Sequence, residues 1–124
     1  MSRAVVLTGG IYHPFAECAQ AIATLLGEFG IDTSITEDVD EAAERLADAD
    51  LFVLYALRWR MLNDPKYQPF LAEWAFEMSG ATAERMESFV ADGGAMLAMH
   101  TASICFDTWS GCAHRRVGVE PQSR

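Results

Sequence analysis

The sequence has few positive charges and no long apolar run. Its 124 residues contain 9 Lys and Arg against 18 Asp and Glu, which gives a formal net charge of −9. Such a chain is repelled by nucleic acid phosphates and by anionic membranes, so neither is an expected partner. No apolar run approaches the roughly 18 residues of a membrane span, and the first residues lack a signal-peptide pattern. We therefore expect a cytoplasmic protein.

Cysteine pairs and nucleotide-binding glycine patterns are also missing. The three cysteines, Cys18, Cys105 and Cys112, are odd in number and form no CxxC motif. This spacing argues against both a disulfide framework and a structural zinc site. Gly9 and Gly10 lack the GxGxxG spacing of a dinucleotide site, and a flavin carrier would need a Ser- and Thr-rich loop there. We expect neither a metal nor a cofactor.

Half of the residues are hydrophobic, and their pattern alternates between strand-like runs and helical stripes. Short apolar runs predict strands at 4–8, 33–36, 51–55 and 95–99. Stripes at spacings of three and four predict helices near 14–29, 40–46 and 81–92, the second capped by Asp40. This order predicts a three-layer α/β/α, flavodoxin-like fold, with a parallel sheet in the strand order 2-1-3-4. Residues 57–79 form a long, aromatic-rich insert that we expect to be irregular and functional.

Ligands of open parallel sheets bind at the carboxyl ends of the strands. Three of the predicted strands end there in residues that could bind a substrate or take part in catalysis. The candidate substrate-binding residues are Gly9, Gly10, Tyr12, Arg58, Trp59 and Thr101, and the candidate catalytic residues are His13 and His100.

His100 is the most prominent of these candidates. It stands where the fourth strand turns into a possible helix, and its small neighbours Ala98 and Ala102 permit a tight elbow. An imidazole there can act as a general acid, a general base or a hydrogen-bond donor near neutral pH. The alternative is a partly buried histidine bound by backbone groups. His13 is its natural partner, with a helix-entry residue before Pro14 as the alternative.

The segment Arg58-Trp59-Arg60 could bind an anionic or polyhydroxylated ligand, with the indole as a stacking face. The alternative is that Trp59 packs within the insert and that both arginines are solvated. Ser103 and Cys105 follow the elbow rather than standing at its tip. Acyl transfer by a serine or cysteine nucleophile is therefore disfavoured.

The sequence resembles the ThuA-like family. The resemblance lies in Gly9-Gly10 with His13, in Trp59, in Gly93-Gly94, in residues 98–102 around His100, and in residues 105–109. It implies the class I glutamine amidotransferase-like fold and a role in the utilisation of trehalose or a related sugar. True amidotransferases carry a cysteine nucleophile at the elbow, where this chain has His100. The resemblance thus implies isomerisation or hydrolysis of a carbohydrate derivative rather than amide transfer.

The resemblance extends over residues 3–111, which we expect to form one ThuA-like domain. Residues 112–124 are expected to be a polar, poorly ordered tail with a charge of +2. Family members continue with further strands, so a truncated relative that serves as a non-catalytic binding module is the alternative function. Without a fifth strand, the fourth would be an exposed sheet edge, which predicts a homodimer.

Overall fold

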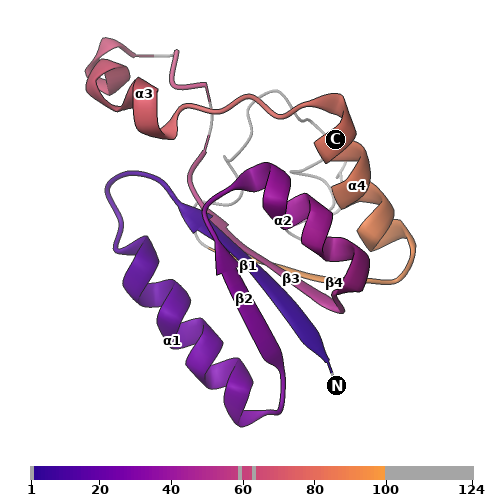
Figure 1. Cartoon of the computed structure of the whole chain (residues 1–124). Coiled ribbons are helices and arrows are strands. Elements are labelled where there is room, and N and C mark those ends of the chain that lie inside the picture. Colours follow the sequence, from indigo (N-terminus) through magenta and orange to yellow (C-terminus); the bar gives the residue numbers. More distant parts are fainter. Residues whose placement is uncertain (1, 59, 63, 100–124) are drawn as a thin grey trace, which may run out of the picture.

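The computed structural model describes residues 2–99, except 59 and 63. Its four strands form one parallel sheet in the order β2-β1-β3-β4, and helices cover both faces (Figure 1). This confirms the predicted three-layer, flavodoxin-like architecture. The elements are β1 (Arg3–Gly9), α1 (Phe15–Glu28), β2 (Asp32–Thr36), α2 (Val39–Arg45), η1 (Leu46–Asp48), β3 (Leu51–Ala56), η2 (Pro65–Phe70), α3 (Leu71–Trp74), α4 (Gly80–Ala91) and β4 (Ala95–Ala98).

The core lies on the two faces of the central strands, β1 and β3. Alternate residues of each strand point to opposite faces, and both faces are apolar, as buried parallel strands require. One cluster packs Leu7 and Phe52 against α2 and α4, whereas another packs Val6 and Val53 against α1. All four side chains are fully buried. Burial of a side chain of this size contributes about 1.5–3 kcal/mol, so these strands dominate the stability of the sheet.

The helix ends explain how the chain leaves each strand. Asp38, and not Asp40 as expected, is the N-cap of α2, and its carboxylate accepts a 3.0 Å hydrogen bond from the Glu41 N–H. Asp40 instead accepts a 2.6 Å hydrogen bond from the Thr82 hydroxyl, which ties α2 to α4. The sequence pattern misled because both aspartates precede the same apolar stripe. Ser79 caps α4 in the same way as Asp38 caps α2.

The insert between β3 and α4 was expected to be irregular, and this expectation is wrong for residues 65–74. It contains η2 and the one-turn helix α3, which project above the carboxyl ends of the strands (Figure 1). Asp64 accepts a 2.9 Å hydrogen bond from the Lys66 N–H, and Pro65 occupies the first turn of η2. Both are ordinary helix-start signals. Hereafter η2 and α3, residues 65–74, are called the lid.

Candidate functional site

The candidate site lies at the carboxyl edge of the sheet, below the lid. The loop after β1, the end of β2 and the segment after β3 come together there. The Leu57 N–H donates a 2.9 Å hydrogen bond to the Gly9 carbonyl, so β1 and β3 remain paired up to this edge. Beyond β4, the Met99 N–H donates a 3.0 Å bond to the Leu54 carbonyl. Residue 99 therefore still lies beside β3 where the described part of the chain ends.

Gly9 and Gly10 allow close packing at this edge. Their φ angles are +112° and +142°, values that side-chain-bearing residues rarely adopt. A Cβ atom at Gly10 would lie 2.6 Å from the Leu57 carbonyl oxygen, and one at Gly9 would lie 2.9 Å from the Trp74 ring. The Trp74 ring thus covers Gly9, which the sequence predicted to be a substrate-binding residue. That predicted role stays a prediction.

Tyr12 and His13 continue the same loop. Tyr12 has a left-handed backbone with φ of 72°, and 63% of its surface is exposed. Its ring contacts Tyr67 and Phe70 of the lid, with centroids 6.3 and 5.9 Å away. His13 is half-buried, and its imidazole lies edge-on to Phe15 at 5.5 Å. The loop therefore presents an aromatic ring and an imidazole side by side in sequence at the predicted edge.

Arg58 is buried, with 7% of its surface exposed. Its guanidinium donates 2.9 Å hydrogen bonds to the carbonyls of Glu37 and Trp74. It also lies 5.4 Å from the centroid of the Trp74 ring and 5.5 Å from that of Phe76. A buried guanidinium is tolerated where hydrogen bonds and aromatic faces replace its water. This geometry fits a residue that fastens the lid to the end of β2.

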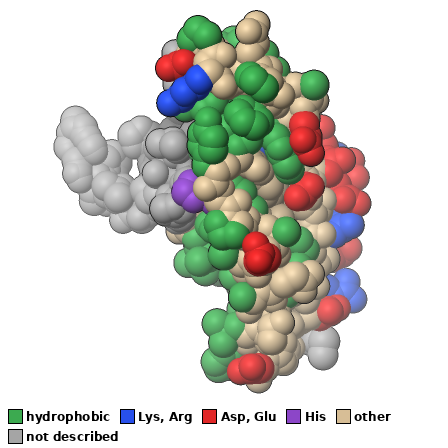
Figure 2. Space-filling model, turned by 90° about the vertical axis from the view of Figure 1, so that its left-hand side faces the viewer, with side chains coloured by type: hydrophobic (Ala, Val, Ile, Leu, Met, Phe, Trp, Pro, Cys, Tyr) green, Lys and Arg blue, Asp and Glu red, His purple; other side chains and the backbone are tan. Residues whose placement is uncertain are grey.

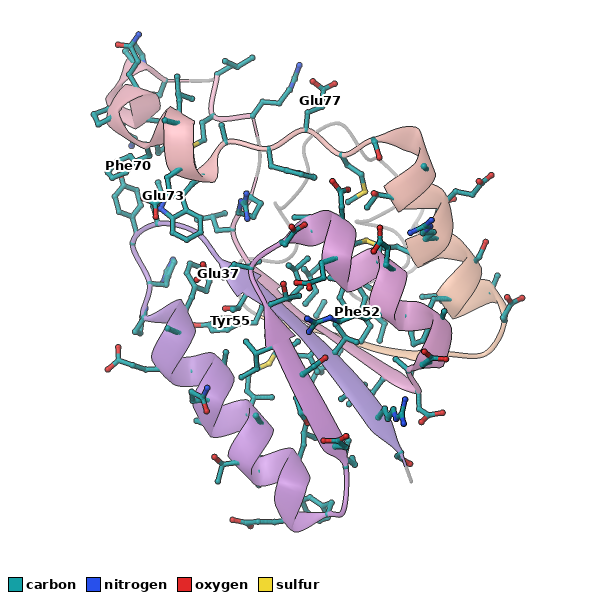
Figure 3. The ribbon with its side chains drawn as sticks, viewed as in Figure 1. Glu37, Phe52, Tyr55, Phe70, Glu73 and Glu77 are labelled. Atoms are coloured by element: carbon teal, nitrogen blue, oxygen red, sulfur yellow. The ribbon has the colours of Figure 1, made fainter. Side chains whose placement is uncertain are left out.

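A buried aromatic cluster joins the lid to the sheet. It contains Phe15, Tyr55 and Met61, and Phe70 and Trp74 pack against it. Figure 3 shows Phe70 above the loop between β1 and α1, and Tyr55 below it on the α1 side of the sheet. Residues 57–79 were expected to be functional because of their aromatic residues, which include Tyr67, Phe70 and Trp74, but these three were given no role in the site. Their spacing of three and four within a helical stretch was the available signal.

The pKa of the Tyr55 hydroxyl is shifted at this edge. The hydrogen bond with the Cys18 side chain, followed by burial, raises the pKa of the Tyr55 hydroxyl. Cys18 is a free thiol on α1, in agreement with its expected place on the apolar face of that helix. The shift keeps the phenol neutral, so Tyr55 acts here as a hydrogen-bonding core residue.

Several predicted site residues lie outside the described residues. These are Trp59, His100 and Thr101. The rejected nucleophiles Ser103 and Cys105 and the tail 112–124 also lie outside the described residues. Arg60 is described and half-buried. The structure thus brings Gly9, Gly10, Tyr12, His13 and Arg58 to one edge, whereas the placement of the other candidates stays a prediction. Among the described residues, no three His, Cys, Asp or Glu side chains group as metal ligands would.

Two hollows lie at the opposite, amino edge of the sheet. One of about 960 Å³ lies between α2 and α4 and has charged walls that include Glu44, Arg85 and Asp92. A smaller one of about 280 Å³ is lined by Arg3, Asp32 and Arg45, among others. Neither hollow includes a residue predicted for the site. The described carboxyl edge is instead closed by the lid.

Comparisons of the chain with protein-family models, with curated proteins and with solved structures give no significant match. The ThuA-like resemblance therefore depends on the quoted residues alone. Within the part of the chain that the structure describes, every helix is too short or too polar to cross a membrane.

Proposed function

We propose that this chain is a ThuA-like domain of the class I glutamine amidotransferase-like superfamily, and that it binds a sugar or sugar derivative at the carboxyl edge of its sheet. The observation that carries the proposal is the meeting of the His13 loop with the end of β3 under an aromatic lid. The strand order 2-1-3-4 supports it, because ligands of such sheets bind at this edge. The free thiol of Cys18 suits the reducing cytoplasm.

In this proposal, His13 and His100 supply acid, base or hydrogen-bonding groups to the sugar. A histidine at the elbow disfavours glutamine hydrolysis, because an imidazole does not replace the thiolate of a cysteine nucleophile. The reaction is isomerisation or hydrolysis of a carbohydrate derivative. Both reactions move protons between oxygen and carbon or oxygen and water, which suits a pair of imidazoles near neutral pH.

The experiment is a calorimetric titration of the full chain with trehalose and with glucose. We expect the wild-type chain to bind at least one of them, and His100→Ala and His13→Ala to weaken binding at least tenfold. His114→Ala is the matched control, because its histidine lies in the tail, and it should bind like the wild type. Unchanged binding in His100→Ala would remove His100 from the proposal. Circular dichroism verifies that each variant folds.

The second candidate function is a non-catalytic binding module. Arg58 and Gly9 favour it, since carbonyl groups hold the guanidinium and the Trp74 ring covers the glycine. A site whose predicted ligand contacts are filled by the protein itself has less room for a substrate. If sugar binding is absent from the wild type and from every variant, this candidate takes precedence.

We also propose that the chain forms a homodimer through β4. Among the described residues, β4 pairs with β3 on one side and with no strand on the other. Leu97 at its centre is 47% exposed, although it is a large apolar residue. Such edges pair with a second copy unless they are covered. Sedimentation should show a dimer that Leu97→Lys converts to a monomer, whereas a concentration-independent monomer in the wild type would refute this assembly.

A further inference from the structure

Tyr12 occupies a backbone conformation that suits glycine better than tyrosine. Its φ of 72° lies in the left-handed region, which costs a residue with a side chain about 1 kcal/mol. Gly9 and Gly10 stand three and two residues before it in the same loop, and a glycine at position 12 would adopt this φ without strain. Strain of this kind is found where a side chain is needed at that place. The tyrosine ring is therefore the feature to explain.

The ring is held firmly although most of it is exposed. It stands edge-to-face with Phe70 at 80° and is tilted by 46° from Tyr67, both at aromatic contact distance. Phe70 and Tyr67 pack in turn against the buried cluster that contains Ile11 and Phe15. We call Tyr12, Tyr67 and Phe70 the aromatic shelf. Figure 2 shows hydrophobic side chains gathered on the upper part of this face, over η2 and α3.

We propose that the aromatic shelf is a stacking subsite for one ring of a two-ring saccharide, which places the next ring at His13. This inference depends on the proposed function and adds the substrate class. A pyranose presents a face of C–H groups that packs on an aromatic ring, while its hydroxyls require hydrogen bonds at the rim. Tyrosine hydroxyls and the Lys66 ammonium, 5.2 Å from the Tyr67 ring centroid, supply polar groups there.

Charge and spacing support a neutral, extended ligand. The net charge of −9 disfavours anionic ligands such as sugar phosphates. Tyr12 and His13 are consecutive, so their Cα atoms are about 3.8 Å apart. In this proposal the ring on the shelf packs on Tyr12, and the adjoining ring of the same saccharide reaches the imidazole of His13, whereas a single ring occupies only one of these two places.

The test compares trehalose and glucose binding in the full chain carrying Tyr12→Gly or Tyr12→Phe. Tyr12→Gly removes the ring and the backbone strain together, so its melting temperature should stay close to that of the wild type. We expect trehalose affinity to fall at least tenfold in Tyr12→Gly and less than threefold in Tyr12→Phe, which keeps the ring face. Glucose affinity should change less than trehalose affinity. Phe29→Ala is the matched control, since Phe29 is 74% exposed at the far end of α1.

The outcomes separate the shelf from the proposed function. If trehalose binds equally to the wild type and Tyr12→Gly while His13→Ala still abolishes binding, the stacking subsite is refuted and the proposed sugar-binding function is retained. If the wild type binds neither sugar, both proposals fall. Saturation-transfer NMR on the wild type adds a readout that needs no variant. Transfer from aromatic protons to the ring C–H protons of trehalose supports the shelf, and its absence in bound trehalose overturns it.

Discussion

The two edges of the sheet differ in what fills them. At the amino edge, a hollow of about 960 Å³ with charged walls lies between α2 and α4. At the carboxyl edge, the lid packs down on the loops, and a buried arginine and several aromatic rings occupy the space. Two hollows lie at the amino edge. Strained backbone, a buried charge and His13 lie at the carboxyl edge, and the proposed site depends on these features rather than on cavity volume.

The largest expected effect is at Gly10. In Gly10→Ala the new Cβ meets the Leu57 carbonyl at 2.6 Å with a φ that alanine avoids, so the loop and β3 have to move apart. We expect a loss of about 3 kcal/mol in unfolding free energy, comparable with overpacking of a core. Gly27→Ala in α1 is the control, because no atom lies near its Cβ and alanine favours helix. It should stabilise the chain by about 0.5–1 kcal/mol. Urea denaturation measures both, and equal effects would contradict the difference between the loop and the helix.

Arg58→Met should have the next largest effect. It removes the hydrogen bonds that join the lid to the end of β2 and leaves the Glu37 and Trp74 carbonyls without this donor. Loss of bonds from a buried charged group costs about 2–3 kcal/mol, and the lid should become sensitive to protease first. Arg85→Met at the amino edge is the control. Its guanidinium lies 3.8 Å from Glu44 on exposed side chains, so its loss should cost under about 1 kcal/mol. Equal protease resistance of the lid in both variants would refute the anchoring role.

The buried strands of the sheet could be predicted from the sequence more reliably than the ends of the helices. Residues 4–8 and 51–55 form apolar runs long enough to identify buried strands, and the alternation with helices then fixes a parallel sheet in the observed order. These predictions succeed because burial on two faces constrains every position of a strand. The helix ends were less certain, as the shift of the cap from Asp40 to Asp38 shows.

At the site, the sequence predicted which loops meet but not what each side chain contacts. Arg58 follows a strand like a solvated arginine, and nothing local reveals that carbonyls 16 and 21 residues away would bind it. Tyr12 likewise gives no sign in sequence of its left-handed backbone. Such long-range contacts depend on how the lid packs against the sheet. Hydrophobic periods of two or 3.6 residues predict strands and helices, but they do not predict which distant segments pack together.

Tyr55 offers a pH-dependent test of the carboxyl edge. Its raised pKa means that folding favours the neutral phenol, so its contribution is complete below the unfolded pKa near 10. The contribution is lost as the pH rises through the folded value. The melting temperature of the wild type should therefore fall above pH 10 more steeply than that of Tyr55→Phe. Cys18→Ala removes the largest cause of the shift and should reduce the alkaline loss. Parallel curves for the wild type and Tyr55→Phe would exclude this account.

The smallest effect is expected for a charge at the amino edge. Arg45 lines the smaller hollow, and its guanidinium forms a 2.8 Å ion pair with Glu41 one turn earlier on α2. Exposed pairs at this spacing contribute about 0.3–0.5 kcal/mol and are screened by salt. Glu41 also accepts a hydrogen bond from the Thr36 hydroxyl, so Glu41→Gln alone would disturb two contacts. A double-mutant cycle of Arg45→Ala with Glu41→Gln isolates the pair. A coupling energy above about 1 kcal/mol that persists in 1 M salt would mean that this ion pair is shielded from solvent. The side chains at the amino edge would then be held more rigidly than we expect, and the two edges would differ less.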